Sequence, residues 1–229
     1  MLGGALSYTR DVGWSPSWRI IPAGVPRFNR LEAVRNQEEY DSLIELVNFT
    51  DPTRRSERGD IFSIPPEERV FGEGSSFLMY PFTLCDSVHS HTRFSDGSFG
   101  VYYCACLRET AIGETVFHKE KFLQEHSVPP TRLESSIVLA DLRANLGDVE
   151  LMEQPIQEKA LDPDSYIFPQ GLGGTLRGMG IPGIVYPSVR HHGGFCAALF
   201  KPSVLRYREI LENALSYIWD GYSIQVVAD

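Results

Sequence analysis

The chain has 229 residues, of which 42% are hydrophobic and 22% are charged, and its formal net charge is −9. This composition excludes wholesale disorder, and the acidic balance argues against direct nucleic-acid binding by the chain itself. There is no apolar run of about 18 residues and no secretory pattern at the start, so we expect no membrane span and a cytoplasmic protein.

The first part of the chain is predicted to hold two strands and one helix, separated by loops. Residues 17–21 (SWRII) favour a strand that ends before a proline, and the prolines and glycine of 22–30 favour a loop. Residues 38–49 have apolar side chains at helical spacing and acidic residues near their start. The charged, Pro- and Gly-rich stretch 51–76 is expected to be a surface segment, followed by a strand over 76–83.

The middle of the chain carries the clearest pattern. Residues 98–107 (SFGVYYCACL) are typical of a strand that is buried on both faces. They continue directly into 108–126, which has an apolar stripe at helical spacing and is followed by two prolines. A further strand is predicted over 135–142, and a helix is predicted over 163–178.

The last part of the chain favours strands. Residues 183–189 and 194–200 are predicted as two strands joined by a histidine-containing loop. The tail, 206–229, is expected to form a helix or a hairpin, because alternating residues surround Asp220-Gly221, a favoured two-residue turn. The elements do not alternate as βαβ units, so we predict an α+β fold in a single domain spanning 1–229.

Cysteine and glycine patterns point away from a metal or a dinucleotide-binding motif. The four cysteines, at 85, 104, 106 and 196, form no CxxC pair and are expected to be buried thiols. A zinc site remains an alternative, although its spacing matches no usual motif. Its four ligands would be His89, His91, Cys104 and Cys106. The glycines of GLGGTLRGMG lie in a helix-like segment, outside the strand–turn–helix context of a dinucleotide fingerprint.

Five side chains combine a functional group with a strand, a strand end or the first turns of a helix. They are Arg19, Arg93, Tyr103, Glu114 and Ser188. Taken singly, each has an ordinary structural explanation in an ion pair, the core or the solvated surface. Glu114 departs from this because it lies in the most apolar part of its helix. Burying a carboxylate costs several kcal/mol unless it is paired, so its position indicates a function.

In their order along the chain, these residues resemble the RES domain family, which is named for its Arg, Glu and Ser. Members carry an arginine segment, a Y-x-A strand, a helix with an A-x-x-E pattern and a strand ending in P-S. The corresponding residues here are Arg93, Tyr103-Cys104-Ala105, Ala111-Ile112-Gly113-Glu114 and Pro187-Ser188, with Trp18-Arg19 in the first strand. The resemblance covers about residues 17–205, and the stretch 23–85 is expected to be an insertion.

The resemblance implies a mixed or antiparallel sheet with flanking helices, similar to that of ADP-ribosyltransferases, and cleavage of the nicotinamide N-glycosidic bond of NAD⁺. It implies that Glu114 stabilises the oxocarbenium-like transition state and that Arg19 and Arg93 hold the pyrophosphate. Tyr103 would stack on the nicotinamide, while Ser188 would hydrogen-bond a ribose or the amide. Tyr102 points to the opposite face and is expected to be core. His191 and His192 are expected to be solvated.

NAD⁺ is thus expected as a substrate rather than a cofactor, with water or phosphate as the acceptor. By the same resemblance, the partner would be an Xre-like helix-turn-helix antitoxin, and homo-oligomerisation is left open. Three other readings remain: an ADP-ribosyltransferase that modifies a protein, a non-catalytic nucleotide-binding or interaction module, and a structural domain without a small-molecule site. Labelled NAD⁺ separates the transferase from the hydrolase or phosphorylase, because only a transferase leaves label on a protein.

Overall fold

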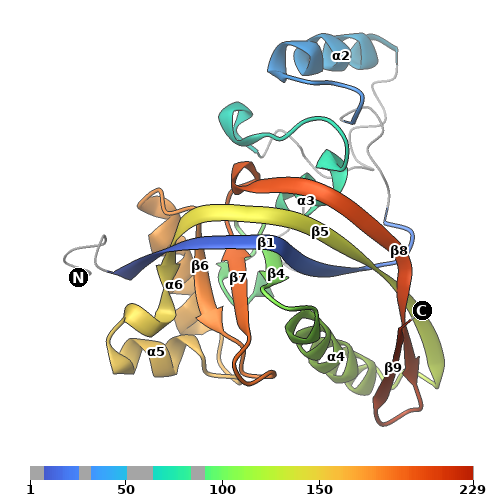
Figure 1. The fold of residues 1–229 in the computed structure, drawn as a ribbon, viewed down its shortest axis with the longest axis vertical. Coiled ribbons are helices and arrows are strands. Elements are labelled where there is room, and N and C mark those ends of the chain that lie inside the picture. The colour runs from blue at the N-terminus through green and yellow to red at the C-terminus, as the bar shows by residue number, and fades with distance from the viewer. Residues whose placement is uncertain (1–7, 26–31, 51–63, 84–90, 229) are drawn as a thin grey trace.

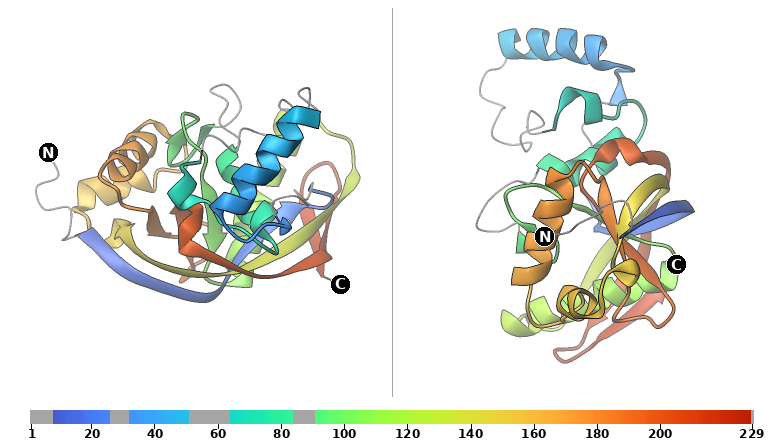
Figure 2. Two further views of the ribbon diagram at one scale, coloured as in Figure 1. Left: turned by 90° about the horizontal axis from the view of Figure 1, so that it is seen from above. Right: turned by 90° about the vertical axis from the view of Figure 1, so that its left-hand side faces the viewer.

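A sheet of seven strands forms the centre of the molecule, and the computed structural model describes residues 8–25, 32–50, 64–83 and 91–228. The long, curved strands are β1 (Thr9–Pro22), β5 (Thr131–Asp148) and β8 (Leu205–Trp219). The short ones are β4 (Tyr102–Ala105), β6 (Gly183–Pro187), β7 (Phe195–Leu199) and β9 (Ile224–Ala228). The long strands run side by side as one curved layer in Figure 1 and in the left panel of Figure 2.

The strand order is β1-β4-β7-β6-β5-β8-β9, and an additional pairing of β1 with β5 closes five of these strands into a ring. At two corners of the ring, neighbouring strands pair over only one or two residues. β1 meets β4 with Trp18 opposite Ala105, and β5 meets β6 in parallel with Gly147 opposite Ile184. All the other pairings are antiparallel. Because β1 and β4 meet over so short a register, they can diverge beside this corner and leave room between the layers.

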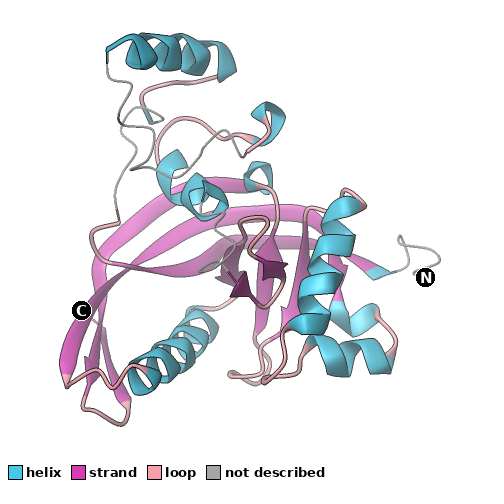
Figure 3. Cartoon of the chain, turned by 180° about the vertical axis from the view of Figure 1, so that it is seen from behind, coloured by secondary structure: helices cyan, strands magenta, loops and turns pink. Residues whose placement is uncertain are grey.

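Helices cover the ring from several sides. The bounds are α2 (Gln37–Thr50), α3 (Ser75–Thr83), α4 (Arg108–Glu125), α5 (Gln154–Ala160) and α6 (Ile167–Gly178). Figures 1 and 3 show α4 and α6 on opposite sides of the short strands and α2 at the far end of the molecule. Of the helices that the structure describes, none combines the length and apolar character that a membrane crossing requires.

Smaller elements join these helices and strands. The ribbon of β2 (His91–Thr92) and β3 (Ser95–Asp96) precedes β4, and single 3-10 turns lie at η4 (Pro66–Glu68), η5 (Val149–Leu151) and η6 (Pro202–Val204). The buried core includes Met79 of α3, Tyr102 of β4 and Ile137 of β5. Tyr40 of α2 is also buried, and its ring lies 5.9 Å from that of Phe71, so this helix of the expected insertion packs against the core.

The structure confirms the α+β class, the mixed and mostly antiparallel sheet with flanking helices, and most of the predicted elements. The helix expected over 108–126 is α4, and the tail is a β8–β9 hairpin. Its turn begins at Asp220-Gly221 as expected, but it has four residues rather than two, because Trp219 pairs with Ile224. The long strands β1 and β5 extend beyond both ends of the predicted ranges, 17–21 and 135–142. β1 begins at Thr9 rather than at Ser17. Pro16 interrupts the strand pattern in the sequence, and the structure accommodates it with a register shift between Trp14 and Ser17.

One predicted strand is wrong. The stretch expected to be a strand over 76–83 forms α3, which is buried along almost its whole length despite Pro81 in its interior. A short run of apolar residues fits a buried helix as well as a buried strand, because periodicity cannot separate the two when every face is covered.

α6 packs closely against the segment that leads into β4. Gly173 is buried in this helix, and a Cβ atom there would lie 2.1 Å from the carbonyl oxygen of Phe94. Gly174, the next residue, faces open space. The missing side chain at 173 therefore lets α6 approach the backbone beside Arg93, which fixes one wall of the site described next.

Candidate active site

A cavity of about 380 Å³ lies where β1 and β4 diverge, bounded by α4 and the β2–β3 ribbon. Its volume falls within the range of small-molecule sites. Four of the five predicted residues line it: Arg19, Arg93, Tyr103 and Glu114. Ser188 lies behind Glu114 and donates a hydrogen bond to it. The fold thus gathers residues from positions 19 to 188 around one space.

Glu114 stands in the second turn of α4, which begins almost directly after β4. Ala111 and Leu123 of this helix are buried, and Ile112 and Val116 pack against the cluster formed by β5 and β8. This apolar stripe docks the helix and leaves Glu114 half-buried at the cavity, as its position in the sequence predicted.

The carboxylate of Glu114 is held through one of its two oxygens. Ser188 Oγ donates to Oε1 at 2.6 Å, and Cys196 Sγ lies 3.8 Å from the same oxygen. Burial and the neighbouring carboxylate raise the pKa of the Cys196 thiol, so it remains protonated and able to donate. Within the described residues, Oε2 has no hydrogen-bond partner. The group is therefore fixed in orientation while one oxygen stays available to a ligand.

Ser188 uses the whole hydrogen-bonding capacity of its hydroxyl inside the protein. Its oxygen accepts from the backbone N–H groups of Arg190 and His191, at 3.1 and 3.0 Å, and its proton goes to Glu114. A hydroxyl has one donor and two acceptor positions, and all three are occupied. This geometry favours a role in positioning Glu114 over the direct substrate contact that the sequence suggested.

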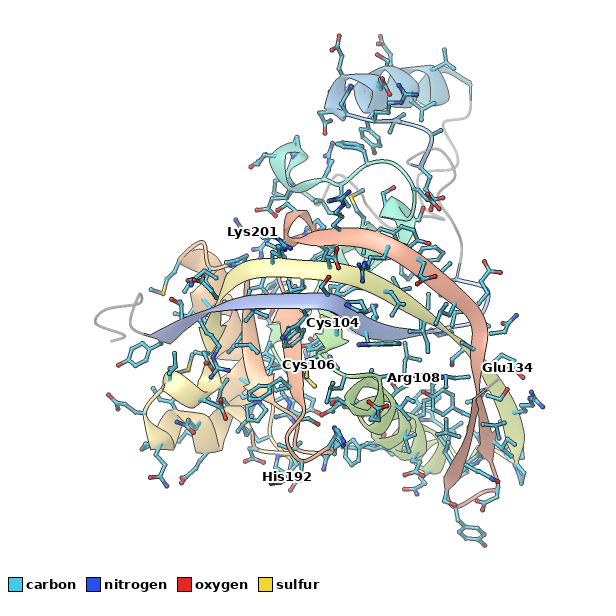
Figure 4. The ribbon with its side chains drawn as sticks, in the orientation of Figure 1. Cys104, Cys106, Arg108, Glu134, His192 and Lys201 are labelled. Carbon is cyan, nitrogen blue, oxygen red and sulfur yellow. The ribbon has the colours of Figure 1, made fainter. Side chains whose placement is uncertain are left out.

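The loop that carries these amides is fastened to α4. Thr110 Oγ1 and His191 Nδ1 share a hydrogen bond of 2.8 Å, and a side chain at Gly194 would collide with both groups. The expectation that His191 is solvated is wrong, because its ring holds the loop against the start of the helix. His192 is exposed, as expected, on the β6–β7 loop (Figure 4).

Arg19 is largely committed to the fold. Its Nη1 donates to the carbonyl oxygen of Tyr103 at 2.8 Å, and its guanidinium lies 4.6 Å from the ring centre of Tyr102. Tyr102 is fully buried, as predicted. Burial lowers the pKa of Arg19, yet an arginine remains charged under such a shift. Its Nε is buried without a hydrogen-bond partner among the described residues.

Arg93 and Tyr103 form the opposite wall of the cavity. Arg93 Nη1 donates to the carbonyl oxygens of Ala160 and Asp162, at 3.1 and 2.8 Å, and its guanidinium lies over Tyr166 at 4.8 Å. The Tyr103 hydroxyl donates to Thr92 Oγ1 and accepts from the Phe94 amide. Burial raises the pKa of Tyr103 to about 12, so the phenol is neutral at physiological pH.

Sequence reasoning gave no role in the site to several further residues of the cavity wall, among them His118, Tyr166, Tyr186 and Cys196. His118 carried a usable signal, since it stands four residues after Glu114 and so shares its helix face. The other three come from distant strands and loops, and no local pattern marks them.

The structure gives no support to the zinc alternative. His89 lies outside the described residues, and Cys106 Sγ accepts the amide of Phe195. Figure 4 labels Cys104 and Cys106, and both are free thiols. Across the described part of the chain, no three His, Cys, Asp or Glu side chains are grouped as metal ligands would be.

Comparison with known proteins gives one family and distant relatives. The model of the RES domain matches residues 67–220, which is more than half of the chain. An uncharacterized protein of Sinorhizobium fredii, y4oC, is 24% identical over 216 residues, covering 92% of this chain and 85% of that protein. The crystal structure of the M. tuberculosis MbcT–MbcA toxin–antitoxin complex aligns with a TM-score of 0.44 and 11% identity, over 89% of this chain and 85% of that one.

Proposed function

The chain belongs to the RES domain family, and from this premise we propose that it is an enzyme that cleaves the nicotinamide N-glycosidic bond of NAD⁺ by hydrolysis or phosphorolysis. The observation that carries the proposal is the oriented Glu114 carboxylate, which presents an unpartnered oxygen in a cavity that two arginines also line. NAD⁺ is the substrate in this proposal, and no resident cofactor is involved.

Cleavage of the N-glycosidic bond requires a negative group such as the Glu114 carboxylate beside the ribose. As the bond between C1′ and the nicotinamide nitrogen breaks, positive charge grows on C1′ and O4′ of the ribose. A fixed negative group beside this centre stabilises the transition state more than the ground state, and stabilisation of that kind lowers the barrier. Glu114 is held by Ser188 and Cys196, so it does not have to reorganise during the reaction.

The other wall of the cavity suits the rest of the substrate. A guanidinium binds phosphate oxygens through paired hydrogen bonds, and Arg93 spends only Nη1 on the described protein groups. Arg93 is therefore the stronger candidate for binding the pyrophosphate. Arg19 contributes positive charge at the cavity wall, although its Nη1 is bound to the carbonyl oxygen of Tyr103. Tyr103 and Tyr166 offer aromatic surface to the nicotinamide and ribose.

Biologically, we propose that the chain is the toxin of a toxin–antitoxin pair, neutralised by an Xre-like helix-turn-helix protein. Membership of the family supports this role. The net charge of −9 is consistent with a pair in which the partner, rather than this chain, contacts DNA.

Incubation of the purified protein with NAD⁺ tests the proposed enzyme. Mass spectrometry should show free nicotinamide, together with ADP-ribose in phosphate-free buffer or its phosphorylated form in phosphate. NAD⁺ that remains intact would refute the activity, and label transferred to a protein would identify a transferase instead. Tight binding of NAD⁺ without nicotinamide release would indicate a non-catalytic module.

Replacing Ser188 with alanine should lower kcat by roughly 10- to 100-fold and leave KM nearly unchanged, because a hydrogen bond to a charged group is worth about 1.5–3 kcal/mol. Ser188 does not line the cavity, so substrate binding should persist. Steady-state kinetics with the exposed Ser98→Ala as control checks this. A raised KM at unchanged kcat would restore the direct substrate contact that the sequence suggested.

A further inference from the structure

His118 lies beside the candidate carboxylate and has no assigned role in the proposed function. It stands four residues after Glu114 on α4 and lines the same cavity. Residues at this spacing are neighbours on one face of a helix. His118 is only partly desolvated: the residue is exposed, so water reaches it at the mouth of the cavity, while the groups around the ring remove part of its hydration.

The imidazole nitrogens of His118 are free of hydrogen bonds within the described part of the chain. The ring packs edge-on against Phe117 at 5.4 Å. Four charged groups act on it: Glu114 and Lys121 from its own helix, Arg93 from the β2–β3 ribbon and Arg190 from the β6–β7 loop. Burial and the three cations lower the pKa of His118, against the opposing effect of Glu114, so the neutral ring predominates at pH 7.

Hydrolysis releases a proton from the attacking water, and Glu114 is poorly suited to accept this proton. Water that attacks C1′ must lose a proton, whereas the carboxylate is most effective while it stays negative beside the cationic ribose. A neutral imidazole one helical turn away, open to water and free of other partners, is well suited to receive that proton.

We propose that His118 is the general base that accepts the proton of the water attacking C1′. This inference rests on the proposed NAD⁺ cleavage. The C1′–N bond breaks and its electron pair leaves on neutral nicotinamide, a C1′–O bond forms, and the water proton moves to a ring nitrogen and then to solvent. The products are ADP-ribose, nicotinamide and one proton. The assignment commits to water as the acceptor, because a phosphate dianion attacks without giving up a proton.

His118→Asn tests this in phosphate-free buffer, since asparagine keeps a polar side chain of similar reach but cannot take up the proton. The variant should release nicotinamide about 100-fold more slowly at an unchanged KM. The wild-type rate should fall at acidic pH, where the ring becomes protonated below the ordinary imidazole pKa, and the variant should lose this dependence. His126→Asn, just beyond the end of the same helix and outside the cavity, should behave as wild type.

Azide gives a second readout, because this anion attacks C1′ without losing a proton. Added azide should restore nicotinamide release by His118→Asn and yield the ribosyl azide. Wild-type turnover in the variant, failure of azide to rescue it, or a wild-type reaction that requires phosphate would each overturn the assignment. A wild-type protein that releases no nicotinamide would refute the proposed function itself, and with it the assignment.

Discussion

Replacing Glu114 with glutamine is expected to slow nicotinamide release about 1,000-fold while the fold persists. The substitution removes the negative charge that opposes the positive ribose. It keeps an oxygen that can accept from Ser188, so the local hydrogen bond and the position of α4 should remain. Nicotinamide can be quantified by chromatography, and circular dichroism with thermal unfolding checks that the two proteins are equally folded.

The matched control for this variant is Glu125→Gln on the same helix. Glu125 is exposed and lies 4.0 Å from Lys121, so its charge should have little influence on either rate or stability. If Glu114→Gln retained the turnover of the wild type, the catalytic role of this carboxylate would be wrong, whatever the variant's stability.

The second large effect is expected for Gly173→Ala, which should destabilise the protein by about 3 kcal/mol, at the upper end of the cost of overpacking. The new methyl group would lie 2.1 Å from the carbonyl oxygen of Phe94, which is backbone and cannot rotate away. Either α6 or the segment beside Arg93 must move, so the variant should also bind NAD⁺ more weakly. Denaturant unfolding and a binding titration measure the two effects.

Gly174→Ala provides the comparison, because the neighbouring position faces open space in the same helix. Alanine there should stabilise the protein by about 0.5–1 kcal/mol, since glycine loses more backbone entropy when the helix forms. Equal stabilities of the two variants would show that α6 does not make the close approach to Phe94.

Local patterns were sufficient for much of the fold and for the half-buried position of Glu114. The apolar stripe of α4, the β8–β9 turn and the unusual setting of Glu114 depend on residues close in sequence. The helix α3 was missed, because its uniform burial removes the periodicity that distinguishes a helix from a strand. Burial of this kind is set by the rest of the molecule.

The sequence predicted which residues lie together better than it predicted what each of them contacts. Arg19, Arg93, Tyr103 and Glu114 share one cavity, as the family resemblance implied. The sequence could not show that Ser188 points its proton at Glu114, because this depends on two backbone amides and a bond between Thr110 and His191. The hydrogen bonds from Ser188 to Glu114 and between Thr110 and His191 join residues 74 and 81 positions apart, so they have no local signature.

The route of the chain through the site has a consequence for its synthesis. Glu114 is made when half of the chain has been synthesised, but Ser188 and Cys196, which orient it, are made more than 70 residues later. A nascent or prematurely terminated polypeptide therefore carries the acid without the strands that aim it. Under the proposed function, truncated products that end before the β6–β7 turn should release no nicotinamide from NAD⁺, because they lack Ser188 and Cys196.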